Sequence, residues 1–272
     1  MSKSYHPAPL EASPTLTETP EIRHVAIPAP YAWLAEGWRD IWIAPHISLA
    51  YGAIFSALAY AIAYQLTRIE ALPLLLPLAG GFLLLGPLFA GGLYEISRRH
   101  ERGEPVRFVD VLLAGRGFRS QLAYLGVALL LLYFFWIRVA LLLFMLFFGS
   151  ADFPPFDDFL QTLFLTKHGQ GLLLVGTATG AIFAGAAFSI SAISVPMIFD
   201  RGVDAVTAMM SSIKAVRYNP QPMALWAVLI VALTGIGFAT AFIGLAVTFP
   251  LIGHATWHAY KALAGAPSRP AV

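Results

Sequence analysis

The stretch that decides the fold covers residues 122–148 and reads LAYLGVALLLLYFFWIRVALLLFMLFF. Its one charged residue is Arg138. About 20 consecutive apolar residues suffice for a helix to cross the hydrocarbon core of a bilayer. The stretch therefore predicts a transmembrane helix, and its extra length allows the helix to tilt.

The composition of the whole chain agrees with this prediction. Of 272 residues, 58% are hydrophobic and 12% are charged, whereas soluble domains carry about 25% charged residues. So few charges cannot cover a water-soluble surface, and the net charge of +2 is too small to suggest a nucleic-acid partner. The absence of cysteine excludes disulfides, thiolate metal sites and cysteine nucleophiles.

Further apolar runs predict the other spans, at residues 47–66, 71–93, 171–199 and 223 to about 260. A single helix over the last run, of roughly 38 residues, would be about 57 Å long. We therefore expect two spans of about 17 residues there, turning near residues 234–237. The predicted fold class is all-α: a polytopic membrane helix bundle of about six transmembrane helices in three hairpins.

The positive charges orient this bundle. With the amino terminus inside, fourteen of the seventeen Lys and Arg residues fall in inner segments, while the outer loops hold only Arg68 and Lys167. Inner loops of membrane proteins carry the excess of Lys and Arg. The sequence thus predicts that both termini are cytoplasmic.

The chain divides into three parts. Residues 1–30 are polar, contain six prolines and have no apolar core, which predicts a disordered cytoplasmic tail and not a signal peptide. Residues 31–262 form the integral membrane helical domain, and residues 263–272 form a short cytoplasmic tail.

A pattern recurs three times within the membrane domain. Short amphipathic segments at residues 31–44, 108–113 and 203–216 precede the odd-numbered spans, and Pro87, Pro196 and Pro250 lie late in the even-numbered ones. This pattern favours three copies of one unit, in which a cytoplasmic interfacial helix precedes a transmembrane hairpin. The alternative is three unrelated amphipathic linkers.

Three motifs carry a family resemblance: GPLFAGGLYEISRRHERGEP (86–105), SVPMIFDRGVDAVTAMMSSIKAVRYNP (194–220) and FPLIGHATWHAY (249–260). The chain resembles, over about residues 22–262, a bacterial domain-of-unknown-function family of predicted integral membrane proteins. The resemblance implies a bacterial inner (plasma) membrane protein without an established activity. Some members are labelled as similar to cytochrome c oxidase subunit I, but a haem-copper core needs six histidine ligands inside the spans, and only His254 and His258 are placed as candidates here.

Arg138 is the first candidate site. It lies about 15 Å from either end of its helix, and a charge at that depth costs at least about 2.5–3.5 kcal/mol on insertion scales. We expect a compensating partner, either backbone carbonyls near Pro77, Pro87 or Pro196 with Ser189, Ser191 or Ser194, or an anionic ligand.

His254 and His258 form the second candidate site. Their i, i+4 spacing places both on one helical face, where two histidines can share a metal ion or belong to a haem pocket. Trp257 and Tyr260 lie beside them, so interfacial anchoring is the alternative interpretation. Because two histidines at this spacing are explained equally well by interfacial anchoring, we expect no cofactor.

The third candidate is a group of arginines: Arg98, Arg99, Arg102, Arg116 and Arg119. Basic residues next to a membrane bind anionic lipid headgroups, and such a surface can also dock other membrane proteins. The alternative is charge that only sets topology and pairs with nearby glutamates.

A row of small residues, Gly176, Gly180 and Ala184, is typical of closely packed helices, with a pore lining as the alternative. Catalytic motifs are absent from the sequence, so we expect no enzyme. The function predicted is that of a non-enzymatic accessory or scaffold protein; the alternatives are a small-solute (anion) transporter or ligand sensor using Arg138, and a haem-binding redox protein.

Overall fold

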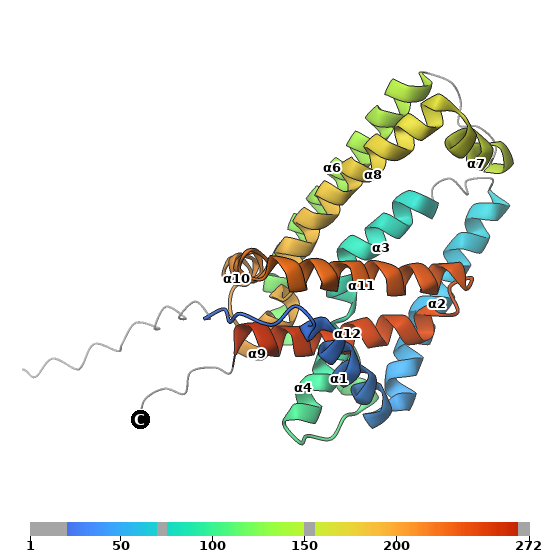
Figure 1. Cartoon of the computed structure of the whole chain (residues 1–272). Helices are drawn as coiled ribbons and strands as arrows, with labels where there is room; N and C mark the ends of the chain where they lie inside the picture. Colours follow the sequence, from blue (N-terminus) through green and yellow to red (C-terminus); the bar gives the residue numbers. More distant parts are fainter. Residues whose placement is uncertain (1–20, 70–74, 150–155, 266–272) are drawn as a thin grey trace, which may run out of the picture.

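The computed structural model describes residues 21–69, 75–149 and 156–265. Within these ranges the chain forms helices and no strand, as predicted. The helices are α1 (Ala29–Ile43), α2 (Pro45–Arg68), α3 (Leu75–Phe89), α4 (Gly91–Glu101), α5 (Phe108–Leu112), the 3-10 helix η2 (Arg116–Phe118), α6 (Arg119–Phe148), α7 (Phe156–Leu165), α8 (Lys167–Ser191), α9 (Ser194–Arg201), α10 (Ala205–Tyr218), α11 (Pro220–Ala239) and α12 (Leu245–Ala264). Figure 1 shows α6 and α8 side by side, and α11 and α12 as a second pair.

Five helical segments of the described residues are long and apolar enough to cross a membrane: Pro45–Arg68, Leu78–Glu101, Phe108–Phe148, Lys167–Arg201 and Pro220–Ala239. They contain the first five predicted spans apart from residues 71–77, of which 71–74 lie outside the described residues and 75–77 belong to α3. The sixth predicted span is also helical, as α12, but it does not meet the same criterion of length and composition. A multi-pass helical membrane protein is thus confirmed, with five candidate spans.

The turn between α11 and α12 was predicted in the wrong place. Residues 234–237 remain helical, and the chain turns after Ala239. Gly237 instead lies where the two helices approach closely, since a Cβ there would be 2.5 Å from a methyl group of Leu245. The turn itself contains two non-glycine residues with positive φ, Ala241 (52°) and Phe242 (68°).

Two of the even-numbered spans are interrupted close to their prolines. The second divides into α3 and α4 at Ala90, three residues after Pro87, which itself lies inside α3, and the fourth divides into α8 and α9 at residues 192–193, three to four residues before Pro196. Proline lacks the N–H that the helical ladder needs and clashes with the carbonyl four residues earlier, which explains the break before Pro196, whereas α3 continues through Pro87 to Phe89. The third proline, Pro250, lies inside α12, which continues through it.

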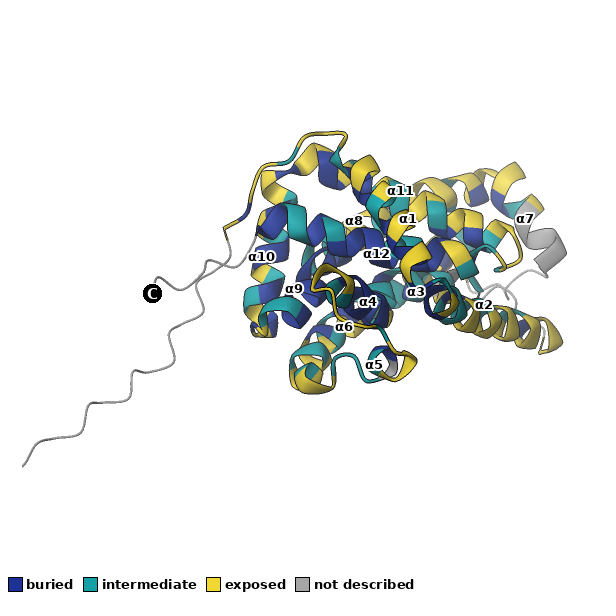
Figure 2. Cartoon of the chain, turned by 90° about the horizontal axis from the view of Figure 1, so that it is seen from below, coloured by how far each residue is buried: buried dark blue, intermediate teal, exposed yellow. Residues whose placement is uncertain are grey.

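Helix α12 is the centre of the packing and contacts α1, α2, α4, α9 and α11. Two glycines allow this crowding: a Cβ on Gly37 of α1 would be 2.6 Å from the Ala255 nitrogen, and one on Gly253 would be 2.5 Å from Leu93. Figure 2 shows α4, α9 and α12 dark blue at the centre and α2 largely exposed. We call the end of the molecule formed by α1, α4, α5, α9 and the C-terminal half of α12 the base.

The ten residues of the predicted N-terminal tail that the structure describes, 21–30, pack against the base. Ile22 is buried, and the Arg23 N–H donates to the Leu263 carbonyl at 2.8 Å. Asn219 makes two hydrogen bonds to the same segment: its Oδ1 accepts from the Val25 N–H at 2.9 Å, and its Nδ2 donates to the Arg23 carbonyl at 3.0 Å. The described segment is therefore tied to the start of α11, whereas residues 1–20 lie outside the described residues.

Candidate functional site

A network of five polar side chains, four of them buried, joins three helices of the base to α2. Asp40 comes from α1, Ser48 from α2, Ser97 from α4, and His254 and His258 from α12. Asp40 is 3% exposed and His254 fully buried. We call these five residues the polar core.

The hydrogen bonds of the polar core connect its five residues in series. Ser97 Oγ donates to Asp40 Oδ2 at 2.5 Å and lies 2.7 Å from His254 Nδ1. Because Ser97 has one proton and gives it to the carboxylate, His254 Nδ1 carries a hydrogen and donates to Ser97. His254 Nε2 then accepts from Ser48 Oγ at 3.0 Å, while His258 Nε2 donates to Asp40 Oδ2 at 2.9 Å.

The network keeps Asp40 ionised although it is buried. Burial raises the pKa of Asp40. The hydrogen bonds from His258 and Ser97, together with the nearby His258 and His254 rings, lower the pKa by more than burial raises it, so the pKa lies below the ordinary 3.8. A buried charge is tolerated when it is hydrogen-bonded in this way. The polar core therefore fixes α1, α2 and α4 on α12.

The two predicted histidines are part of this network. Both ring nitrogens of His254 have serine partners, so a metal or haem iron at His254 would have to displace Ser48 or Ser97. No group of three His, Asp or Glu residues in the part of the chain that the structure describes has a metal-holding arrangement. A metal or haem at His254 and His258 stays a prediction.

The arginine candidates fall into two sets, of which the first is engaged in ion pairs. Arg98 donates two hydrogen bonds to the buried Glu95 carboxylate, at 2.7 and 2.8 Å, and Arg99 donates one to the same carboxylate at 2.8 Å. Arg102 pairs with Asp200 at 3.3 Å. The pairs of Arg98 and Arg99 with the buried Glu95 lie within α4, whereas the partly exposed Arg102 joins the end of α4 to Asp200 of α9.

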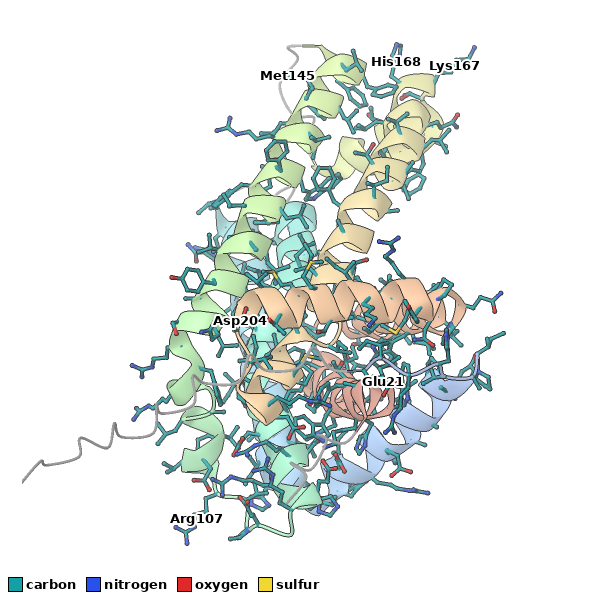
Figure 3. All side chains as sticks on the ribbon, turned by 90° about the vertical axis from the view of Figure 1, so that its left-hand side faces the viewer. Glu21, Arg107, Met145, Lys167, His168 and Asp204 are labelled. Carbon is teal, nitrogen blue, oxygen red and sulfur yellow. The ribbon has the colours of Figure 1, made fainter. Side chains whose placement is uncertain are left out.

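The second set is Arg116 and Arg119, at the start of α6. Both are exposed, and neither has an ion pair or side-chain hydrogen bond among the described residues. The two arginines are therefore available to ligands outside the chain. Figure 3 shows Arg107, in the same connecting segment, at the opposite end of the molecule from Lys167 and His168.

Arg138 lies on the outer surface of α6 and is exposed. None of the hydrogen bonds or ion pairs within the described ranges involves it. The hydroxyls of Ser189, Ser191 and Ser194, which were predicted partners, bond instead to carbonyls four residues earlier in their own helical turns. The internal pairing expected for Arg138 is thus not formed among the described residues, and anion binding by Arg138 stays a prediction.

Asp40 was not among the predicted site residues, because an aspartate next to Arg39 in an amphipathic segment is expected on the polar face of its helix. A signal was present, however. Asp40 follows the buried residues Trp33 and Gly37 at spacings of seven and three, which puts it on the packed face of α1. The serines carried no such signal, because their role depends on which helices meet.

The comparisons with known proteins agree with the membrane assignment. Residues 74–200 match the family described as predicted integral membrane protein (DUF2189), within the wider range, about 22–262, over which the resemblance was predicted. No curated protein and no solved structure matches the chain.

Proposed function

We propose, from the premise that residues 74–200 belong to the predicted integral membrane protein family DUF2189, that the chain is a non-enzymatic accessory or scaffold protein of the bacterial inner membrane. Its cytoplasmic face binds anionic lipid headgroups through Arg116 and Arg119. The observation that carries this proposal is the contrast between these two exposed, unpaired arginines and the paired Arg98, Arg99 and Arg102.

The position of the two arginines fits a lipid contact. Both lie where the long apolar helix α6 begins, which is the depth of lipid headgroups if α6 spans the bilayer. Each basic residue near an anionic membrane surface contributes about 1 kcal/mol of attraction. Because no internal carboxylate within the described ranges engages them, this attraction is available to lipid.

The proposed topology has six spans and places the base on the cytoplasmic side. The α11–α12 hairpin supplies the last two spans, and surrounding helices shield α12 from lipid, which explains why α12 is less apolar than the others. The helices α1, α5 and α10 lie in or near the interface. This arrangement puts Arg107, Arg116 and Arg119 inside and Arg68 and Lys167 outside, in agreement with the positive-inside rule.

The polar core supports a structural role. Its carboxylate and both nitrogens of His254 are engaged with one another or with serines, and catalysis requires groups that can reach a substrate. The geometry is that of a network that positions helices. We therefore assign no catalytic residue.

Lipid binding is tested by thermal melting of the detergent-purified protein with phosphatidylglycerol or phosphatidylcholine. We expect phosphatidylglycerol to raise the melting temperature of the wild type and to lose most of this effect in the Arg116→Gln/Arg119→Gln variant. The matched control is Arg68→Gln/Lys167→Gln, which removes two positive charges at the other end of the bundle and should keep the full response. An equal loss in both variants, or an equal response to both lipids, would contradict the proposal.

Topology is tested separately, since the natural chain has no cysteine. Single cysteines at the exposed positions Ser120 and His168 are treated with a membrane-impermeant maleimide in spheroplasts. We expect labelling of His168→Cys and protection of Ser120→Cys until the membrane is permeabilised. The reverse pattern would invert the proposed orientation.

A further inference from the structure

The helix α6 carries a charge deep inside its apolar length. It belongs to the most apolar of the candidate spans, and Arg138 lies ten residues, or about 15 Å, from its nearer end at Phe148. A basic side chain reaches the lipid headgroups by snorkelling only when it lies near the end of a span. If α6 crosses the bilayer, the guanidinium of Arg138 therefore remains among hydrocarbon.

One face of α6 is packed inside the molecule. The helix contacts α3 and α8, and its residues Leu125 and Leu129 are fully buried. The contact with α8 is close, since a Cβ on Gly180 would be 3.2 Å from the Trp136 ring. Gly180 belongs to the row of small residues that was predicted to allow close packing.

The opposite face of α6 is exposed, and Arg138 lies on it. Arg138 follows Leu129 by nine residues, or two and a half helical turns, so the two side chains point in opposite directions. Exposed residues recur on this side at spacings of three and four: Val127, Leu131, Phe134, Arg138, Leu141 and Met145. We call these six residues the outer seam. Figure 3 shows α6, the green helix, along one edge of the molecule, and the spacing of the seam suits a second helix that packs along it with a left-handed crossing.

The charge of Arg138 indicates what the second helix must carry. Charged residues inside a membrane span almost always face the interior of a helix bundle, where they meet a partner. Arg138 instead faces outward and has no polar partner among the described residues. The bundle that encloses it is therefore larger than this chain. A carboxylate matches the guanidinium best, because it accepts two parallel hydrogen bonds from it.

A second copy of the chain cannot supply this carboxylate. The acidic residues inside the five candidate spans all lie in the base: Glu95, Glu101, Asp110 and Asp200. Copies inserted in the same orientation keep these groups at the level of the base and away from Arg138. A free anion is a poor substitute, because Arg138 does not line the cavity of about 690 Å³ between α3, α4, α8, α11 and α12, and an anion in contact with hydrocarbon loses its hydration.

We propose that the outer seam binds a transmembrane helix of a different protein, and that this helix carries an Asp or Glu which pairs with Arg138 within the bilayer. The inference rests on the accessory or scaffold role proposed above and names the class of partner that this role requires. The contact lies outside the base, so Arg116 and Arg119 remain available to lipid headgroups.

Binding is tested with the full chain in phosphatidylcholine vesicles and two synthetic peptides as probes. Each peptide is a leucine-rich transmembrane helix of about 20 residues with flanking lysines, and its central residue is Asp in one and Leu in the other. Energy transfer from a donor on the peptide to an acceptor on His168→Cys reports association, since the natural chain has no cysteine and His168 is exposed. We expect the Asp-centred peptide to bind about five- to thirtyfold more tightly, which corresponds to the about 1–2 kcal/mol of a polar contact between membrane helices. Equal binding of the two peptides by the wild type would overturn the proposal.

Three variants locate the contact. Arg138→Leu should bind both peptides equally. Leu131→Ala shortens a side chain of the outer seam and should weaken binding of the Asp-centred peptide, whereas its matched control Leu58→Ala, on the exposed side of α2, should not; the two leucines are 61% and 54% exposed. A preference for Asp that survives in Arg138→Leu, or equal losses in the two alanine variants, would overturn the proposal.

Further arms of the experiment separate other occupants. Self-association of the wild type in the same vesicles, if Arg138→Leu abolishes it, would assign the outer seam to a second copy. Loss of the preference for Asp in phosphatidylglycerol vesicles would assign Arg138 to a lipid phosphate. Either result would overturn the proposal. The Arg116→Gln/Arg119→Gln variant should prefer the Asp-centred peptide as strongly as the wild type does, so a failure of headgroup binding is distinguished from a failure of this inference.

Discussion

The helices α6 and α12 were predicted from the same kind of apolar run, but they occupy opposite positions in the molecule. In α12, thirteen of the twenty residues are buried, whereas in α6 only Leu125, Leu129 and Phe144 are buried among thirty. The helix in the centre carries two histidines and a lysine, and the helix at the surface is the more apolar. Hydropathy therefore measures contact with lipid more than burial by protein, because a helix shielded by its neighbours can place polar groups against polar partners.

The largest effect is expected where α12 is packed most closely. In Gly37→Leu, the new side chain would begin 2.6 Å from the Ala255 nitrogen and would push α1 away from α12. Overpacking of this kind costs about 3 kcal/mol at the upper end of its usual range, and here the displacement would also separate Asp40 from His258. The apparent melting temperature in detergent should fall steeply.

The matched control for this variant is Gly235→Leu on α11, where a Cβ would meet nothing within 4 Å. It should change the melting temperature little, because leucine is a better helix former than glycine. Similar losses in the two variants would mean that α12 is no more tightly packed than the periphery.

The next effect concerns the polar core. Asp40→Ala leaves His258 and Ser97 without the carboxylate that accepts from both. An unsatisfied buried donor such as Ser97 costs about 1–3 kcal/mol, whereas His258 is 27% exposed and can bond to water, so we expect a loss of about 2 kcal/mol in unfolding measurements. Glu36→Ala, on the same helix, removes an exposed pair with Arg39 and should cost less than about 1 kcal/mol; the opposite ranking would show that the polar core does not hold α1.

A smaller effect is expected from pH. The folded-state pKa of Asp40 lies below 3.8, so its ionised form contributes stability that is fully present above the unfolded-state pKa. That contribution is lost as the pH falls through the lowered folded-state pKa. Melting curves should therefore show the stability advantage of the wild type over Asp40→Asn shrinking below about pH 4; an advantage that grows on acidification would contradict the assignment of Asp40 as ionised.

The sequence was sufficient for the parts of the fold that depend on lipid. Apolar length predicted the helices α2, α6 and α8, and amphipathic spacing predicted helices within the segments that became α1, α5 and α10. It could not supply the partners of His254, because Asp40, Ser48 and Ser97 come from three other helices. Such contacts depend on how helices are arranged around α12, which no local pattern encodes.

The turn near Ala241 and the division of the arginines were missed for related reasons. Glycines at 235 and 237 favour a turn by composition, but close approach of two helices uses the same residue type, and the structure uses Gly237 in that way. Likewise, Arg98 and Arg116 are equivalent in a count of charges. They differ because Glu95 lies one helical turn before Arg98, whereas Arg116 lies in a connecting segment without a carboxylate partner among the described residues.

The smallest effect is expected at Arg138, on the exposed surface of α6. Since Arg138 has no polar partner among the described residues, Arg138→Leu removes no internal contact, and exposed substitutions usually change stability by less than about 0.5 kcal/mol. In detergent the melting temperature should therefore stay close to that of the wild type, while membrane insertion should improve, because a charge near mid-helix costs at least about 2.5–3.5 kcal/mol on insertion scales. Melting curves of both proteins with a panel of small anions complete the test. Unfolding of the variant would show that Arg138 stabilises the bundle. An anion that stabilises only the wild type would make the lipid-facing side of α6 a binding surface, and α6 would then, like α12, place a polar group against a polar partner.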